Sequence, residues 1–315
     1  MAGITCFQIA CSKFDPLIDH PDDEWLSGGA QTAFDEGSSA FSHMFSNMPE
    51  GLERVHEIGD LQFEAIFVSA PAPVNPGLGP LFNSTSCVSC HIGDGRGKIP
   101  GGGEPVANTL FRLSLPGEGP HGAPLAVPKF GDQIQNRAIF GLPKEAEVKV
   151  TYQQIEGTFA DGTSYQLRKP VYTIIEAYET LPENFLISPR VAAPVFGLGL
   201  LEAISEADIL QNVDAEDTDQ DGISGRPNQV WDLVQQKTVM GRFGWKANQP
   251  SILQQAAAAY NGDMGITTSL FPKENSIGQS QFQGSGGGDY ELSDSLLHAV
   301  EFYIRTLALP VRRNA

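Results

Sequence analysis

GLGPLFNSTSCVSCHIGDGRG, residues 77–97, contains a Cys-x-x-Cys-His motif formed by Cys87, Cys90 and His91. Two cysteines at this spacing can each form a thioether with one vinyl group of a haem. The histidine that follows them can then ligate the iron. The motif therefore predicts covalent attachment of one haem c, with His91 as the proximal iron ligand.

Glycine and proline surround this motif on both sides. Gly77, Gly79 and Pro80 interrupt regular structure just before it. The three glycines after it are expected to leave room for a flat macrocycle to approach the backbone. They are Gly93, Gly95 and Gly97.

A zinc knuckle and a redox dithiol are the two alternatives for a Cys-x-x-Cys pair. Structural zinc needs four ligands, usually from a second nearby pair, and the other cysteines, Cys6 and Cys11, lie at the N-terminus. A redox dithiol usually belongs to a βαβ unit, which the sequence does not indicate. Haem is therefore the favoured ligand.

The chain has 315 residues and a formal net charge of −18, which disfavours nucleic acids because phosphate would be repelled. The charge is explained by solubility or, alternatively, by docking to a basic redox partner. No apolar run reaches the roughly 18 residues of a transmembrane helix.

The N-terminus resembles the end of a bacterial lipoprotein signal. Ile9-Ala10-Cys11-Ser12 has the form of a lipobox in which Cys11 would be acylated, although a basic segment before it is lacking. The alternative is an ordinary disordered start. We expect residues 1–30 to be a signal remnant and linker, and the protein to be periplasmic, with membrane contact through a lipid on Cys11.

Apolar spacing predicts a mainly α fold, a cytochrome c-like haem domain over residues 31–315 with long loops. Helices are expected over 32–47 and 52–68, after Ser205, around 256–260 and from Ser293. His43 and Met44 could be iron ligands but fit a packed stripe better. His56 is expected at the solvent boundary.

Two regions interrupt this helical pattern. Residues 93–135 read as long loops, and a β-hairpin over about 146–175 is predicted to turn at Asp161-Gly162. Three arginines could pair with haem propionates, and His121 is expected in an exposed loop. The arginines are Arg96, Arg112 and Arg137.

A run of alternating carboxylates suggests a calcium loop. Asp217, Asp219 and Asp221 are followed by Gly222, which permits a sharp turn, and carboxylates so spaced converge around a hard cation. The twelfth position is Asn228 rather than glutamate, so the EF-hand pattern is incomplete. The alternative is a solvated acidic turn.

A methionine thioether can occupy the sixth position of haem iron. Met264 lies in a glycine-flanked segment after the predicted helix at 256–260, and we expect it to be the distal ligand. A packing role is the alternative.

Successive blocks of this sequence resemble the di-haem oxidoreductases, bacterial c-type cytochromes also described as thiol oxidoreductases or peroxidases. Besides residues 77–97, the blocks are SPRVAAPVFGLGLLEAI (188–204), DTDQDGISGRPN (217–228), GRFGWKANQPS (241–251), DMGITTSLFP (263–272) and LALPVRR (307–313). The resemblance implies an exported electron-transfer protein with the first haem on Cys87, Cys90 and His91.

The resemblance has one departure. Family members usually continue past the last block into a second Cys-x-x-Cys-His domain. This chain stops where that domain would begin, which suggests a truncated or split reading frame. We expect its partner to be a periplasmic redox protein or a second-haem domain. Three hypotheses follow: the first-haem portion of a peroxidase-like or thiol-oxidising oxidoreductase, a mono-haem electron carrier, or a zinc-dependent interaction module.

Overall fold

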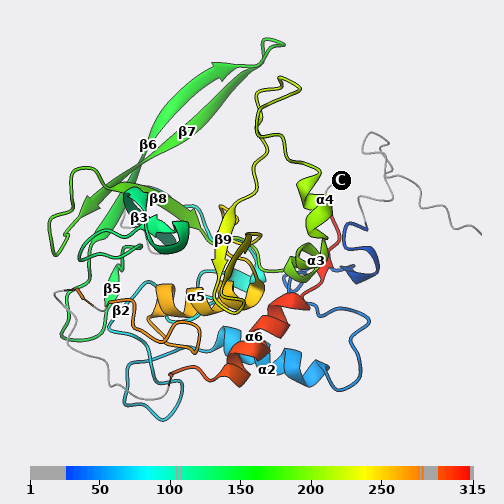
Figure 1. The fold of residues 1–315 in the computed structure, drawn as a ribbon, viewed down its shortest axis with the longest axis vertical. Coiled ribbons are helices and arrows are strands. Elements are labelled where there is room, and N and C mark those ends of the chain that lie inside the picture. The colour runs from blue at the N-terminus through cyan, green and yellow to red at the C-terminus, as the bar shows by residue number, and fades with distance from the viewer. Residues whose placement is uncertain (1–25, 104–105, 107, 277, 280–289, 313–315) are drawn as a thin grey trace, which may run out of the picture.

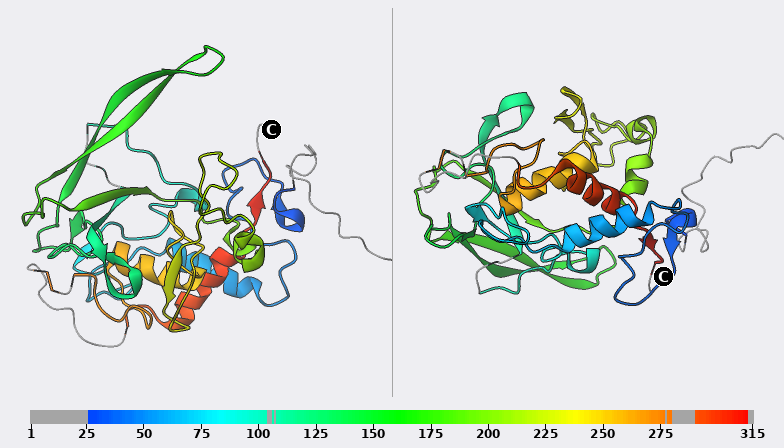
Figure 2. Two further views of the ribbon diagram at one scale, coloured as in Figure 1. Left: turned by 45° about the horizontal axis from the view of Figure 1, so that its top comes forward. Right: turned by 90° about the horizontal axis from the view of Figure 1, so that it is seen from below.

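Three α-helices from distant parts of the chain pack together on one side of the molecule (Figures 1 and 2). They are α2 (Glu53–Glu64), α5 (Ile252–Met264) and α6 (Asp294–Arg305). The short helix α3 (Leu198–Ala203) contacts α5 and α6, and α4 (Glu206–Leu210) follows it in the chain. The computed structural model describes residues 26–103, 106, 108–276, 278–279 and 290–312.

Serine N-caps set where the helices begin. The hydroxyl of Ser293 accepts a hydrogen bond from the Leu296 amide at 3.4 Å, and Ser251 caps α5 through the Gln254 amide at 3.2 Å. Ser205 caps α4 in the same way. The predicted helix starts at Ser205 and Ser293 are therefore confirmed.

The crossing of α2 and α6 is close because a glycine lies at the contact. A Cβ atom at Gly59 would lie 2.1 Å from the carbonyl oxygen of Ala299 and 2.6 Å from the Cβ of Tyr303. The two backbones can approach this far only without a side chain at position 59. Phe63, one turn further along α2, is consequently pressed into the core between the helices.

The helical core joins these three helices to the haem motif. Its buried members include Phe63 from α2, Phe67 just after α2, Tyr260 and Met264 from α5, and Tyr303 from α6. Cys87 and Val88 pack against this cluster.

Strands form the other side of the molecule (Figure 1). The main sheet has the order β4-β3-β8, where β3 (Thr109–Glu118) pairs antiparallel with β8 (Leu186–Val191) and with β4 (Pro124–Leu125). A second hydrophobic core lies here, with Phe111, Phe130 and Val148 among its buried side chains. The remaining short elements are β1 (Thr32–Ala33) with β11 (Leu309–Pro310), β2 (Leu81–Phe82) with β5 (Arg137–Ala138), β9 (Gln229–Asp232) with β10 (Lys237–Met240), and the 3₁₀ turns η1 (Gly29–Gln31), η2 (Ile92–Asp94) and η3 (Pro120–Gly122).

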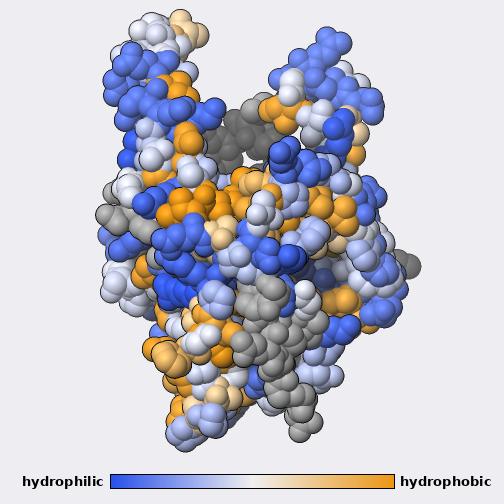
Figure 3. All heavy atoms as spheres, turned by 90° about the vertical axis from the view of Figure 1, so that its left-hand side faces the viewer, coloured by the Kyte–Doolittle hydropathy of each residue, from blue (hydrophilic) through white to orange (hydrophobic). Residues whose placement is uncertain are grey.

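The predicted β-hairpin is confirmed. β6 (Glu147–Thr158) pairs antiparallel with β7 (Ser164–Ile175), and Gly162 in the turn has φ +88°. The base of the hairpin joins the second core, whereas its distal half projects away from the molecule (Figure 1). On the face shown in Figure 3, hydrophobic and hydrophilic residues are intermixed, and two lobes project at the top of the view.

The expected mainly α fold is wrong, because strand (25%) slightly exceeds helix (21%). The region read as loops at 93–135 contains β3, in which Thr109, Phe111 and Leu113 are buried and their neighbours are less so. That alternation is the period of a strand. This strand was missed in the sequence because the segments on both sides of it are rich in Gly and Pro, which favour loops.

The helix expected over 32–47 does not form either. Asp35 accepts hydrogen bonds from the Gly37 amide at 2.6 Å and the Ser39 hydroxyl at 2.8 Å, which folds the segment into a turn. Among the described residues, no helix has both the length and the apolar character needed to span a bilayer. The lipobox at Cys11 lies outside the described residues.

Candidate haem-attachment site

The haem motif is a single helical turn. The backbone amides of Cys90 and His91 both donate to the carbonyl of Cys87, at 3.1 and 3.0 Å. Cys87 and Cys90 are not joined in a disulfide, and each is partly buried. The turn therefore offers two thiols and one imidazole from a compact piece of backbone.

The imidazole of His91 has a fixed orientation. Its Nδ1 lies 2.7 Å from the backbone carbonyl oxygen of Ala193, a group that can only accept a hydrogen bond. Nδ1 must therefore carry the proton, and Nε2 keeps its lone pair. This is the tautomer that a histidine needs to ligate iron through Nε2.

Ala193 is held beside the motif by two backbone hydrogen bonds. Gly97 donates to the carbonyl of Ala192 at 2.9 Å, and Val195 donates to the carbonyl of Asp94 at 3.0 Å. The indole of Trp245 donates to Val191 at 2.7 Å and supports the same segment. The segment 191–195 thus fixes the orientation of His91, although the two are about a hundred residues apart in the sequence.

The glycines around the motif serve close contacts between chain segments. A Cβ at Gly79 would lie 2.6 Å from the Cα of Gly265, where the chain crosses the end of α5. After the motif, Gly95 packs against Phe41 and Gly97 against Ala192. Two of the three glycines expected to leave room for a macrocycle therefore accommodate protein instead.

The electrostatic environment keeps all three motif side chains uncharged near neutral pH. Burial raises the pKa of Cys87 to about 12, and the Asp263 carboxylate adds to this shift. Burial likewise raises the pKa of Cys90 and lowers the pKa of His91. A neutral imidazole is the form that binds a metal.

The donor set fits haem better than zinc. Among the residues that the structure describes, no further cysteine, histidine or carboxylate lies with Cys87 and Cys90 in a group of three close enough to share one ion. Tetrahedral zinc would need two more such ligands. Two unpaired thiols and one oriented imidazole match the two vinyl groups and the iron of a haem.

Met264 is the last residue of α5 and not part of the loop after it. Its side chain is only 2% exposed and belongs to the helical core against which Cys87 packs. The Gly79 amide donates to its carbonyl at 2.9 Å, which fixes this residue close to the start of the motif run. Its role as distal ligand stays a prediction.

The other predicted side chains are placed as follows. Arg112 forms an ion pair with Asp132 at 2.9 Å, while Arg96 and Arg137 are exposed. His43 binds Asp35 at 2.7 Å, and the half-buried Met44 forms a backbone bridge to Leu307.

His121 and His56, the other two histidines discussed from the sequence, differ in burial. His121 is exposed, as expected, and its ring stacks on Trp231 with centroids 3.8 Å apart. His56 was expected at the boundary, but it is 4% exposed and its Nδ1 lies 2.7 Å from the Thr306 hydroxyl.

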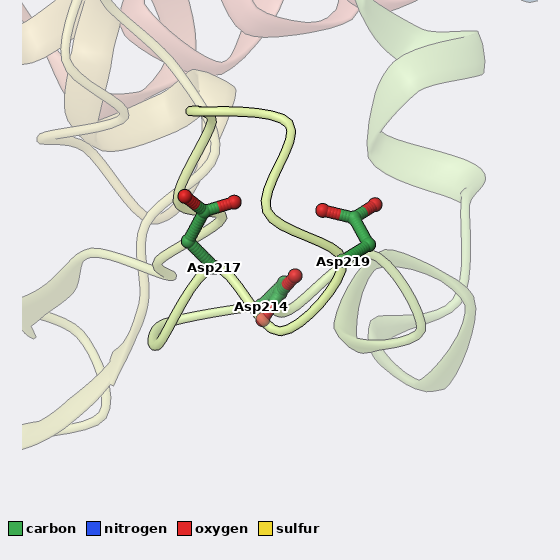
Figure 4. Close-up of side chains that lie close together, drawn as sticks. All are labelled: Asp214, Asp217 and Asp219. Atoms are coloured by element: carbon green, nitrogen blue, oxygen red, sulfur yellow. The ribbon is translucent and has the colours of Figure 1, made fainter.

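The acidic turn differs in one ligand from the predicted set. Asp214, Asp217 and Asp219 bring carboxylate oxygens within 4.8 Å of one another (Figure 4). Asp221 instead accepts a hydrogen bond from the Ile223 amide at 2.7 Å. Gly222 has φ +84° and forms the sharp turn that the sequence indicated.

Sequence reasoning missed the groups that hold the motif in place. They are a backbone carbonyl at Ala193 and the side chains of Asp94 and Tyr303. Tyr303 donates its hydroxyl hydrogen to Asp94 at 2.8 Å. A backbone carbonyl leaves no residue signature, whereas Asp94 lies inside the quoted run and could have been singled out as a buried carboxylate.

The family described as "Di-haem oxidoreductase, putative peroxidase" matches residues 22–315. The chain belongs to this family of oxidoreductases. No curated protein and no solved structure matches the chain.

Proposed function

We propose that the protein is a c-type cytochrome that carries one haem on Cys87, Cys90 and His91 and transfers electrons in the bacterial cell envelope as part of a peroxidase-like or thiol-oxidising system. The observation that supports this most directly is the 2.7 Å contact between His91 Nδ1 and the Ala193 carbonyl, which leaves Nε2 available for iron. Its partner would be a periplasmic redox protein or a second-haem domain.

Each motif residue has a distinct role in this proposal. When bound, haem supplies an iron centre that exchanges single electrons. The thiols of Cys87 and Cys90 anchor the porphyrin covalently, and Ala193 keeps the His91 ring at one angle. The apolar side chains behind Cys87 limit the access of water to this side of the site.

Co-expression with a cytochrome c maturation system tests the attachment. The wild type should retain haem on a denaturing gel, whereas the double variant Cys87→Ala/Cys90→Ala should lose it. Ser89→Ala, between the two cysteines, is the matched control and should keep the haem. A wild-type chain without covalent haem after co-expression would contradict the proposal.

An electron carrier with a closed coordination sphere is the second candidate. It is favoured by the deep burial of Met264 in the core that contacts the motif. In that case Met264→Ala should abolish the far-red charge-transfer band of a methionine-ligated ferric haem and permit reaction with peroxide. Met240→Ala, which truncates a methionine that is 5% exposed in β10, should change neither.

Calcium binding and envelope location complete the proposal. Asp214, Asp217 and Asp219 would bind Ca²⁺ through their carboxylates, because hard cations prefer oxygen ligands. Acylation of Cys11 would tether the protein to a membrane in the periplasm. Metabolic labelling with an alkyne-bearing palmitate should mark the wild type and spare Cys11→Ser.

A further inference from the structure

Tyr303 is a buried tyrosine whose hydroxyl group reaches the haem motif. It lies on α6, is 1% exposed, and donates a hydrogen bond to Asp94 Oδ1 at 2.8 Å. Asp94 follows His91 by three positions and is itself 5% exposed. The Ser42 hydroxyl donates to the other carboxylate oxygen at 2.5 Å.

One aromatic ring joins Tyr303 to the candidate iron ligand. The Phe63 ring centroid lies 5.5 Å from that of Tyr303 and 6.1 Å from that of His91. The centroid of the His56 ring lies 4.8 Å from that of Tyr303. Only the Phe63 side chain therefore separates the Tyr303 phenol from the His91 imidazole, the proposed iron ligand.

A buried phenol gives up an electron readily only if its proton can leave at the same time. Burial, with the neighbouring Asp94 and Asp60 carboxylates, raises the pKa of Tyr303 well above its ordinary value, so a phenolate is not present beforehand. A hydrogen-bonded carboxylate can accept the proton. Tyr303 has such a partner in Asp94.

Tyr260 offers an internal comparison. It is equally buried, at 1% exposure, and belongs to the same core. Its hydroxyl donates to the backbone carbonyl of Gln62 at 3.4 Å and also hydrogen-bonds the Cys87 side chain. Neither an amide carbonyl nor a protonated thiol is a good proton acceptor. Two tyrosines of similar burial therefore differ in whether a base receives their proton.

We propose that Tyr303 is a redox-active tyrosine that gives one electron to the oxidised haem at His91 while its proton passes to Asp94. The O–H bond of Tyr303 breaks, an O–H bond forms on Asp94 Oδ1, and a neutral phenoxyl radical remains. Peroxide starts the reaction as a two-electron oxidant and is reduced to water with two protons from solvent. Tyr303 supplies one of the two electrons, and an external donor supplies the other. An external one-electron donor later restores the tyrosine, which takes the proton back from Asp94. This inference rests on the proposed haem attachment and its reaction with peroxide.

Freeze-quench electron paramagnetic resonance of the haem-loaded protein after mixing with peroxide tests this step. The wild type should show an organic radical whose spectrum narrows with ring-deuterated tyrosine. Tyr303→Phe, which keeps the ring contacts, should lose this signal, and Tyr260→Phe should keep it. Asp94→Asn should reduce the radical yield per unit of Soret change measured in the same sample.

Three outcomes would overturn the inference: the same radical in Tyr303→Phe, its loss in Tyr260→Phe, or no radical in a wild type whose Soret band responds to peroxide. A Soret band that ignores peroxide would refute the peroxidase proposal alone. The same variants would then be oxidised with a flash-quenched ruthenium photo-oxidant. The inference again requires a tyrosyl radical in the wild type and in Tyr260→Phe, and none in Tyr303→Phe. If Tyr303→Phe fails to bind haem, two other measurements test the inference. The radical spectrum of the wild type must narrow with ring-deuterated tyrosine, and Asp94→Asn must lower the radical yield.

Discussion

The haem-motif turn at residues 87–94 and the acidic turn at residues 214–222 are held in opposite ways. The first is held by groups far away in sequence: Ala193 fixes His91, and Tyr303 and Ser42 bind Asp94. The second is held largely from within. Thr218 donates to Asp214, and the Gly222 amide donates to Asp217.

The haem-motif turn therefore depends on the packing of distant segments, whereas the acidic turn depends mainly on hydrogen bonds among its own residues. Burial raises the pKa of Asp94, whereas backbone and side-chain donors of Thr218 lower the pKa of the half-buried Asp214. A buried ligand set depends on the packing of several elements. An exposed one should survive changes elsewhere and contribute little to overall stability.

The packing behind the haem motif can be disturbed at the helix crossing. Gly59→Ala places a methyl group 2.1 Å from the Ala299 carbonyl, so α2 and α6 must separate. We expect a loss of about 3 kcal/mol in the free energy of unfolding, measured with urea. Calcium binding at the acidic turn should be unaffected.

Gly101→Ala is the control for this change, because nothing lies within 4 Å of the added Cβ. Its effect should stay below about 0.5 kcal/mol. Equal effects of the two substitutions would show that the close approach of α2 and α6 does not limit stability.

Buried and exposed carboxylates should also differ in their pH dependence. Glu145 is fully buried, and burial raises its pKa from 4.5 to about 8. Between these values the unfolded chain releases a proton that the folded chain retains, so stability falls as pH rises from about 5 to 8. The expected loss is on the order of 3 kcal/mol.

Glu145→Gln should flatten this dependence when unfolding free energies are measured with urea at several pH values. The exposed Glu156 in the hairpin provides the control, since Glu156→Gln should retain the wild-type slope. A slope unchanged in Glu145→Gln would mean that this carboxyl group titrates normally.

The smallest effect is expected at the acidic turn. Calcium at about ten times its dissociation constant should stabilise the protein by about 1.4 kcal/mol, seen as a rise in Tm. Asp219→Asn should weaken this response, whereas Asp221→Asn, outside the convergent group, should leave it intact. A calcium response weakened by both substitutions would favour the ligand set read from the sequence. No calcium response in the wild type would leave this region a solvated acidic turn.

Local signals in the sequence predicted local structure well. The Ser205 and Ser293 caps, the Asp161-Gly162 turn and the sharp bend at Gly222 all depend on residues within a few positions of one another. Such features follow from backbone preferences that need no tertiary contact.

Features that depend on distant segments were missed. The β3–β8 pairing joins Thr109 to Val191, and no local pattern reveals that partner. His56 was misplaced because its burial comes from Thr306 and Tyr303 on α6. For the site, the motif identified three side chains, but the carbonyl that orients His91 could only be found in the folded structure.

The projecting β6–β7 hairpin offers a site for attaching a tag to this protein. Its tip at Asp161-Gly162 lies beyond the part of the hairpin that packs into the second core. An affinity tag or a single attachment point grafted there would leave both hydrophobic cores undisturbed. Proteins immobilised through this arm would all face an electrode or sensor surface with the same side, so that every copy in the layer shares one orientation.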